Sequence, residues 1–330
     1  MAVNSTRQLT AAFRKAASDG AVSDAESRML IGHAGRDGLT KAETRVLAQQ
    51  LALHQDKFEP AAAQRMSRFV AAAQKPADTA DPRVMRHDLG ALHDALATGD
   101  LYKAGVGVRD VVQGHAGDCY LMSTLAAAAK QRPALISNAI TRKEDGSFIV
   151  RFYQRGPDGK PQPVYVPVDK ELPRDKWGHA HYAHAAAHGE LWVSLVEKAY
   201  AKWKGNSYEK IGNGGNPAEV MEALTGTMGN WSQSSDVAPD VLYDTLQAQL
   251  SKKGLAVAST RTGAQYQGSG VVPSHAYTVL GVEDVAGKKM VRLRNPWGST
   301  EPGAPRSGDG VFSISLSKFI QLFPDLFLSA

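Results

Sequence analysis

Apolar residues follow two different spacings along the chain, and the change between them divides it into parts. Residues 1–73 place alanine and leucine among arginine and glutamine, which is typical of amphipathic helices. Apolar side chains recur at helical spacing again through Leu191, Leu195 and Ala199. Beyond residue 254 the apolar runs become short and are separated by turn-forming residues. These later runs predict strands at residues 255–260, 276–285, 288–297 and 310–316.

A hairpin and a linker complete this outline. The runs "FIVRFYQ" and "QPVYVPVD", joined by the turn-forming "RGPDGK", predict two antiparallel strands within residues 148–169. Two prolines and several small polar residues after residue 73 indicate a linker. We therefore predict the α+β class, with a small all-α domain, a linker, and a domain whose first half is helical and whose second half is antiparallel β. These parts cover residues 1–73, 74–84, and 85–330, the last divided into 85–230 and 231–330.

The first domain contains a short repeat. "DGAVSDAESRML" and "DGLTKAETRVL" align Ser23 with Thr40 and Glu26 with Glu43. Ser or Thr three residues before Glu is a capping box, which starts a helix. The units are similar to the second half of an EF-hand loop, but lysine, glycine and alanine hold the early positions that need oxygen ligands. We expect calcium-incompetent helix–turn–helix units that serve docking, inhibition or recognition of a protein partner.

Charge and hydropathy exclude some functional classes. The chain has 38 Lys and Arg against 33 Asp and Glu, a net charge of +5. Because the basic excess is spread along helices without interleaved aromatic residues, a solvated surface is favoured over nucleic-acid binding. No apolar run is long enough to span a membrane, and the N-terminus lacks the apolar core of a secretory signal. We expect a cytoplasmic protein or one exported by a route that leaves no such signal.

Cys119 is the only cysteine in the chain, which excludes an internal disulfide and a zinc site of several cysteines. A lone cysteine is usually a small buried apolar residue. This one follows Gly114, Gly117 and an aspartate and opens an apolar run, which predicts the N-terminus of a helix. A thiolate is favoured there because of the helix dipole. Gln113 could add its side-chain amide to the Cys119 backbone N–H as a second oxyanion donor.

A cysteine nucleophile needs a base and a group that orients the base. His275 enters a predicted strand, and Asn295 ends the next strand along the chain. Adjacent antiparallel strands would bring these two side chains together, so that Asn295 fixes the imidazole tautomer. Trp297 could cover that hydrogen bond from water. Each residue alone is more typical of a structural role, and the hypothesis depends on their occurring together.

Four segments resemble the calpain family of papain-like cysteine proteases, and they occur in the same order. The segments are "QGHAGDCYLM", "ELWVSLVEKAYAKWKGNSYEKIGNGG", "HAYTVLGVEDV" and "VRLRNPWG". The resemblance extends over about residues 85–325 and leaves the first domain uncovered. It implies a papain-like core with a nucleophile, a base, an orienting amide, an oxyanion donor and a shielding ring: Cys119, His275, Asn295, Gln113 and Trp297, respectively.

The activity that the resemblance implies is hydrolysis of internal peptide bonds in a protein or peptide substrate by a Cys–His–Asn mechanism. Two alternatives stay open. One is a catalytically silent scaffold that binds proteins, although retention of the complete triad disfavours it. The other is an acyl transferase that uses the same triad.

Two positions depart from the family pattern. Tyr120 follows the nucleophile where the family usually has Trp, which keeps an aromatic wall and adds a hydroxyl. Ser274 precedes the histidine where the family usually has Gly, so a side chain could narrow the cleft or rigidify the loop. Neither change removes a catalytic group.

Calcium is the one cofactor that the resemblance implies. In the first half, the family's ligands correspond to the Gly105 carbonyl and the carboxylates of Asp110 and Glu190, oxygen donors that suit this cation. In the second half, Glu301 and Asp309 correspond to acidic ligands, but a valine stands at the final acidic position, so we expect this site to be eroded. Two hypotheses stay open for the first half: a calcium site, or residues that persist in a calcium-independent enzyme.

Overall fold

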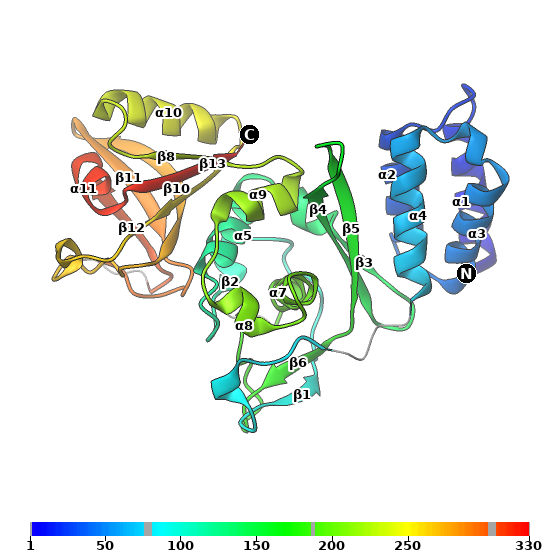
Figure 1. Ribbon diagram of the computed structural model, residues 1–330, viewed down its shortest axis with the longest axis horizontal. Helices are drawn as coiled ribbons and strands as arrows, with labels where there is room; N and C mark the ends of the chain where they lie inside the picture. The colour runs from blue at the N-terminus through cyan, green and yellow to red at the C-terminus, as the bar shows by residue number, and fades with distance from the viewer. Residues whose placement is uncertain (1, 76–80, 186–188, 303–307, 330) are drawn as a thin grey trace. The chain divides into compact units, whose positions relative to one another are not determined.

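The computed structural model of the chain confirms the α+β class (Figure 1). It describes residues 2–75, 81–185, 189–302 and 308–329. The chain forms two compact units, each built from two segments. Unit 1 is Met1–Asp81 with Asn138–Lys170, and unit 2 is Pro82–Ser137 with Glu171–Ala330.

Unit 1 begins with four helices, in agreement with the helical periodicity of the N-terminal residues. They are α1 (Ala2–Ala16), α2 (Asp24–Ala34), α3 (Lys41–Leu53) and α4 (Pro60–Gln74). Both predicted capping boxes are present, because Ser23 and Thr40 each cap a helix whose third residue, Glu26 or Glu43, bonds back to the cap. The repeat in the sequence therefore marks two helix starts.

A three-stranded antiparallel sheet completes unit 1. Its order is β3 (Ile140–Arg142), β4 (Phe148–Arg155) and β5 (Pro161–Val168). β4 and β5 form the predicted hairpin. The sheet packs on α4, with Ile149 in the same apolar cluster as Phe69 and with the Phe69 and Tyr165 rings edge to face at 5.3 Å (Figure 1). The association of this hairpin with the N-terminal helices was not indicated by the sequence.

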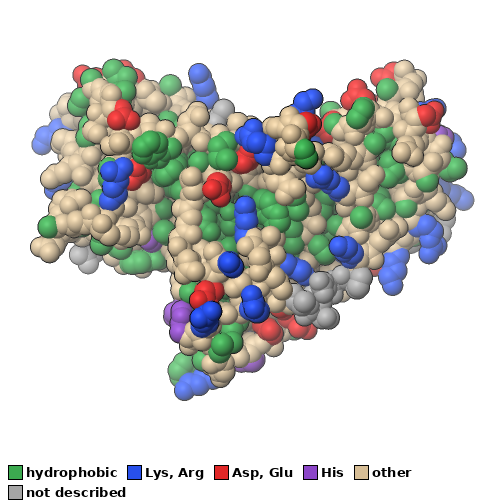
Figure 2. Space-filling model, in the orientation of Figure 1, with side chains coloured by type: hydrophobic (Ala, Val, Ile, Leu, Met, Phe, Trp, Pro, Cys, Tyr) green, Lys and Arg blue, Asp and Glu red, His purple; other side chains and the backbone are tan. Residues whose placement is uncertain are grey.

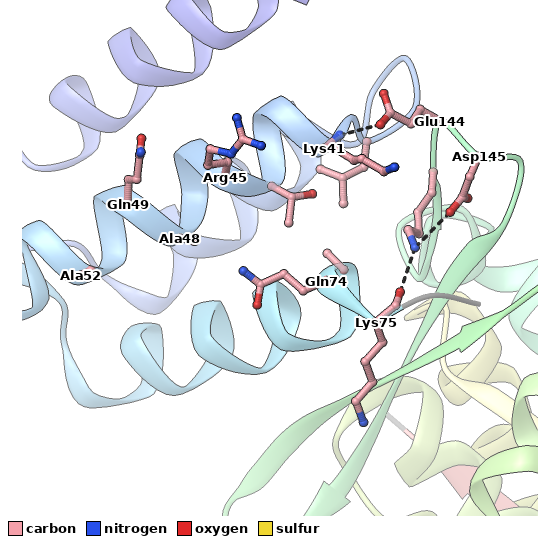
Figure 3. Close-up of a pocket in the computed structure, with 13 residues that line it drawn as sticks. Lys41, Arg45, Ala48, Gln49, Ala52, Gln74, Lys75, Glu144 and Asp145 are labelled. Atoms are coloured by element: carbon pink, nitrogen blue, oxygen red, sulfur yellow. Dashed lines mark hydrogen bonds and ion pairs between the residues drawn. The ribbon is translucent and has the colours of Figure 1, made fainter. Parts of the chain in front are cut away.

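A groove of about 710 Å³ opens on unit 1 (Figure 3). One side is a stripe of α3, where residues one turn apart, Lys41, Arg45 and Gln49, follow each other along the helix. The end of α4 forms the other side, and the turn between β3 and β4 closes one end. Lys143 in this turn donates to the carbonyl of Lys75 at 3.0 Å, which ties the turn to α4.

The helical half of unit 2 comprises residues 82–137 and 171–229. The helices are α5 (Cys119–Gln131), α6 (Ala134–Ser137), α7 (Trp192–Trp203), α8 (Tyr208–Gly212) and α9 (Pro217–Thr225). Two short antiparallel pairs lie beside them: β1 (His93–Leu96) with β6 (Glu171–Arg174), and β2 (Val111–Val112) with β7 (His184–Ala185). α5 and α7 are almost wholly buried, so they form the core of this half.

The β half of unit 2, residues 230–329, is a six-stranded antiparallel sheet in the order β12-β11-β10-β9-β13-β8. The strands are β8 (Asn230–Gln233), β9 (Leu255–Ser259), β10 (Ala276–Val285), β11 (Lys288–Arg294), β12 (Val311–Ser315) and β13 (Asp325–Ser329). Two helices, α10 (Pro239–Ser251) and α11 (Leu316–Leu322), share an apolar core with the sheet. The sheet fixes which strand ends lie side by side.

Charged side chains are dispersed on the face that Figure 2 shows, with acidic groups among many of the basic ones. None of the helices in the described ranges combines the length and the apolar character that crossing a membrane requires.

Candidate active site

Cys119 is the first residue of α5, at the predicted helix start. The turn before it depends on close backbone approach. A Cβ added to Gly117 would lie 2.3 Å from the carbonyl oxygen of Gly212, and one added to Gly114 would lie 2.3 Å from the backbone of Tyr182. Any larger residue would displace the turn, so the two glycines of the motif are required by packing.

Tyr120, where the family usually has Trp, faces inward. The ring is 6% exposed, and its hydroxyl donates to the carbonyl of Ile211 at 3.2 Å. A Cβ at Gly215 would lie 2.4 Å from the Tyr120 ring. The glycine-rich loop after α8 is therefore shaped to receive the aromatic ring that follows Cys119.

His275 and Asn295 lie side by side at neighbouring strand ends. His275 immediately precedes β10, Asn295 follows β11, and the two strands pair in antiparallel register. The Nε2 atom of His275 lies 2.9 Å from Oδ1 of Asn295, which is wholly buried. Trp297 donates its backbone N–H to the same oxygen at 3.1 Å, and its ring lies 4.7 Å from the imidazole. This bond occupies Nε2 and leaves Nδ1 as the nitrogen that can accept a proton.

Two hydroxyl groups connect the helix of the cysteine to the strand of the histidine. Ser123 in α5 donates to the carbonyl of Ala276 at 2.8 Å. Thr278 in β10 donates to the carbonyl of Ser123, also at 2.8 Å. Neither residue was identified from the sequence as part of the site. The signal that could have indicated them is a polar residue inside each apolar run. The paired bonds hold the N-terminal part of α5 against the start of β10.

Burial controls the electrostatics of Cys119 and His275. Burial raises the pKa of the Cys119 thiol, and the backbone N–H of Ala276, the residue after His275, acts in the opposite direction. Burial lowers the pKa of His275, and the Asn295 hydrogen bond partly opposes this. Both shifts favour a neutral thiol and a neutral imidazole, in contrast to the thiolate that a helix N-terminus alone favours.

Gln113 links the turn before Cys119 to the loop that carries Asn295. Its backbone N–H donates to the carbonyl of Pro296 at 2.9 Å. One side-chain N–H donates to the carbonyl of Ala116 at 2.7 Å, and the residue is 9% exposed. The amide plane is therefore fixed, which leaves its second N–H as a preoriented donor.

Ser274 has φ of +51°, in the left-handed region that favours glycine. The family's usual glycine at this position has a conformational reason, and the serine here adopts a strained backbone conformation.

The acidic residues of the first half form one cluster. Oε1 of Glu190 accepts the backbone N–H groups of Lys103 and Ala104 at 2.7 and 3.1 Å. Asp110 accepts from Gly107 at 2.6 Å and from the Trp192 indole at 3.1 Å. Burial raises the pKa of Asp110, and the nearby Glu190 carboxylate adds to the increase. Oε2 of Glu190 is buried, and no donor from the described residues reaches it. Two close carboxylates with an unsatisfied oxygen fit a hard cation.

The acidic residues of the second half have internal partners. Glu301 accepts the backbone N–H of Gly310 at 2.7 Å. Asp309 pairs with Arg109 at 3.0 Å and accepts the backbone N–H of Val311 at 3.2 Å. Across the described ranges, no three or more His, Cys, Asp or Glu side chains form a group that could hold a metal. A cation in the first half would therefore need backbone oxygens as well.

Comparison with known proteins identifies the family. Residues 91–309 match the family described as calpain family cysteine protease. Human calpain-9 (Homo sapiens) is 32% identical over 209 residues, which are 58% of this chain and 29% of calpain-9. The rice calpain-type cysteine protease ADL1 (Oryza sativa subsp. japonica) is 35% identical over 208 residues, 60% of this chain and 9% of the relative.

The chicken calpain-2 catalytic subunit (Gallus gallus) is 32% identical over 207 residues, 58% of this chain and 28% of the subunit. The chain thus spans less than a third of the length of each of these relatives. Because the family match covers more than half of this chain and includes Cys119, His275 and Asn295, the chain belongs to the calpain family of cysteine proteases.

Proposed function

We propose that the chain is a cysteine endopeptidase with Cys119 as nucleophile, His275 as base and Asn295 as the residue that orients the base. The observation that carries this proposal is the 2.9 Å bond from His275 to Asn295, beside the strand that α5 contacts through Ser123. A helix N-terminus bearing a thiol and an oriented imidazole are the parts that acyl transfer requires.

The reaction proceeds by attack of the Cys119 sulfur on the carbonyl carbon of the scissile peptide bond. The thiol proton passes to Nδ1 of His275, because Asn295 occupies Nε2. The second N–H of the Gln113 amide and the backbone N–H of Cys119 stabilise the oxyanion. The imidazolium then protonates the leaving amine, and a water molecule deprotonated by His275 hydrolyses the acyl-enzyme.

Desolvation at the site determines the resting protonation state. Since burial raises the pKa of Cys119 and lowers that of His275, the free chain favours the proton on sulfur. The Asn295 bond favours the protonated imidazole and so assists transfer of the proton.

Calcium regulation through the first half is the second part of the proposal. Asp110 and Glu190 would hold the ion together with the Gly105 carbonyl, and the unsatisfied Glu190 oxygen supports this arrangement. The bound ion would supply a positive charge that draws the two carboxylates and their loop together. We propose no calcium in the second half, because Glu301 and Asp309 already have donors.

The decisive experiment measures hydrolysis of casein by the full chain with calcium and with a chelator. We expect fragments from the wild-type chain and none from Cys119→Ala, with circular dichroism showing that the variant is folded. Glu219→Gln, a change on α9 outside the proposed catalytic residues, is the matched control and should cleave casein normally. Equal cleavage by Cys119→Ala would contradict the assignment of the nucleophile.

Product analysis separates the alternatives. Mass spectrometry should find products that gain water at the cleaved bond, whereas acyl transfer to an added amine would leave that amine attached. A folded wild-type chain that yields no product in either buffer would indicate a binding scaffold.

A further inference from the structure

Two acidic side chains are buried directly behind the proposed nucleophile. Asp118 is the residue before Cys119, and Glu197 lies in α7; they are 0% and 1% exposed. An aspartate before a helix usually caps it by accepting a backbone N–H. The Asp118 side chain makes no such bond, and its carboxyl faces the Glu197 carboxyl instead.

This pair lacks the donors that two carboxylates would need. Both Glu197 oxygens accept the backbone N–H of Ala183, at 3.2 and 3.0 Å. In the ranges that the structure describes, no N–H donor of another residue reaches either Asp118 oxygen, and no Lys, Arg or His pairs with either acid. Apart from the Glu197 carboxyl, only its own backbone N–H favours the charged form of Asp118. Two buried negative charges with so few donors would be strongly destabilising. A single proton held between the carboxyls removes one charge and supplies the missing hydrogen bond.

We propose that Asp118 and Glu197 share one proton and act as positioning residues for Cys119, keeping the second negative charge away from its sulfur. This inference rests on the proposed function of Cys119 as nucleophile. The proton belongs to the pair rather than to either residue.

The surroundings of the pair support retention of that proton near neutral pH. Burial raises the pKa of Asp118 to about 7 and raises the pKa of Glu197 well above its ordinary range, with the neighbouring charge adding to the latter. Among the described residues, the ionisable groups that face the pair are the Cys119 thiol and the phenols of Tyr120, Tyr182 and Tyr200. These groups are neutral near pH 7, so none of them supplies a positive charge to replace the proton.

The position of the remaining charge matters to the thiol. A charge on Asp118 raises the pKa of Cys119, in addition to the larger effect of burial. Asp118 also anchors the first turn of α5, because its carbonyl accepts the N–H groups of Leu121 and Met122 at 2.8 and 3.1 Å. Loss of the shared proton would therefore oppose thiolate formation and push the start of α5 away from α7.

Two isosteric variants place the single charge on opposite sides. In Asp118→Asn the new amide donates to Glu197, which fixes the charge on Glu197. In Glu197→Gln the amide donates to Asp118 while its oxygen still accepts from Ala183, which fixes the charge next to Cys119. Because Cys119 is the only cysteine, the rate of alkylation by iodoacetamide against pH reports this thiol alone.

We expect Glu197→Gln to be alkylated about tenfold more slowly than Asp118→Asn at pH 7, which corresponds to about one pKa unit between their thiols. The alkylation rate of the wild-type chain should equal that of Asp118→Asn at low pH. It should fall below the rate of Asp118→Asn at the pH at which the pair loses its proton. Glu219→Gln removes a carboxyl that is outside the pair, and it should match the wild type. Identical profiles for Asp118→Asn and Glu197→Gln would overturn the proposal.

Infrared spectroscopy of the folded wild-type chain provides a test that needs no variant to fold. At pH 6 we expect a protonated-carboxyl band in the wild type. If Asp118→Asn folds, its band should be smaller than that of the wild type. Absence of the band from the wild type would also overturn the proposal. A wild-type chain that cleaves no peptide but shows the asymmetric alkylation profiles would contradict the proposed protease function and leave the shared proton standing.

Discussion

The two halves of unit 2 place their site residues by different means. The helical half positions Cys119 through backbone contacts that only glycine permits, as at Gly117 against Gly212. The β half positions His275 and Asn295 through strand register and side-chain hydrogen bonds. Where a residue's position depends on the absence of a neighbouring side chain, almost no added atoms should be tolerated. Where its position depends on hydrogen bonds, the loss of a single polar group should have a measurable effect.

The acidic loops of the two halves differ in how far internal hydrogen bonds satisfy their carboxylate oxygens. Glu190 in the helical half has one buried oxygen that no donor of the described residues reaches, whereas Glu301 in the β half accepts the backbone N–H of Gly310. Similar carboxylates are therefore not equivalent as cation ligands. The number of internal donors that already satisfy each oxygen decides which loop has capacity for an ion.

The largest difference that we expect separates the proposed oxyanion donor, Gln113, from the proposed orienting residue, Asn295. Gln113→Ala should lower kcat by about 10²- to 10³-fold and leave the pH profile unchanged, because the amide acts only on the oxyanion. Asn295→Ala should lower kcat/KM by about 10²-fold through misplacement of the imidazole. The Asn295 hydrogen bond raises the pKa of His275 in the wild type, so its loss should lower that pKa. The acidic limb of kcat/KM should therefore move to lower pH.

Asn295→Asp provides the opposite sign for the same position. A carboxylate beside Nε2 stabilises the imidazolium, so the acidic limb should move to higher pH. Steady-state kinetics between pH 5 and 9 measure both shifts. Shifts of the same sign in Asn295→Ala and Asn295→Asp would mean that Asn295 does not control the protonation of His275.

Stability should separate the glycines of the two halves. Gly117→Ala should lower the free energy of unfolding by about 3 kcal/mol, because its Cβ collides with the Gly212 carbonyl. Gly281→Ala in β10 is the matched control, since apart from its chain neighbours no described residue has an atom within 4 Å of the added Cβ, and it should change stability by less than about 0.5 kcal/mol. Urea denaturation measures both values, and equal values would show that the close approach is not rigid.

Calcium should distinguish the two acidic loops. Calcium at about 100 times its dissociation constant should stabilise the wild-type chain by about 2.7 kcal/mol. Glu190→Gln should remove most of this gain, whereas Glu301→Gln should retain it, because the Glu301 side chain already has an internal donor. Thermal unfolding with calcium and with a chelator tests this. The assignment of the calcium site to Glu190 would be contradicted if both variants lost the stabilisation by calcium, or if calcium did not stabilise the wild-type chain.

The smallest effect concerns the strained serine before His275. Ser274→Gly should stabilise the chain by about 1 kcal/mol, because glycine adopts a φ of +51° without the Cβ penalty. Urea denaturation compares this variant with the wild type. A destabilised variant would show that the Ser274 side chain contributes more than its backbone strain costs.

The sequence carried enough local information to predict some of these features. Short apolar runs separated by turn-forming residues predicted β10 and β11, and chain order made the ends at His275 and Asn295 neighbours. The capping boxes at Ser23 and Thr40 were readable because a cap involves residues three positions apart. These features depend on interactions within an element or between consecutive strands.

Other features depend on packing between distant segments, which has no periodic signal in the chain. Neither the burial of Asp118 against Glu197 nor the Ser123–Thr278 bonds could be deduced from spacing, because both join segments far apart in the sequence. The same is true of Ile149, whose partners are in the N-terminal helices. For the calcium ligands, the sequence identifies oxygen atoms but not which of them already accept hydrogen bonds.

The shared core of unit 1 has a consequence for how this chain can be divided. Ile149 is 1% exposed within a cluster formed mainly by the N-terminal helices, and Arg68 of α4 donates to the carbonyl of Pro163 at 2.9 Å. Removing the helices would bare an apolar sheet face, so a truncated chain would tend to self-associate whatever the helices do for catalysis. The N-terminal helices do not form a separable module. Transferring them to another protein requires the strands of residues 138–170 to be transferred as well.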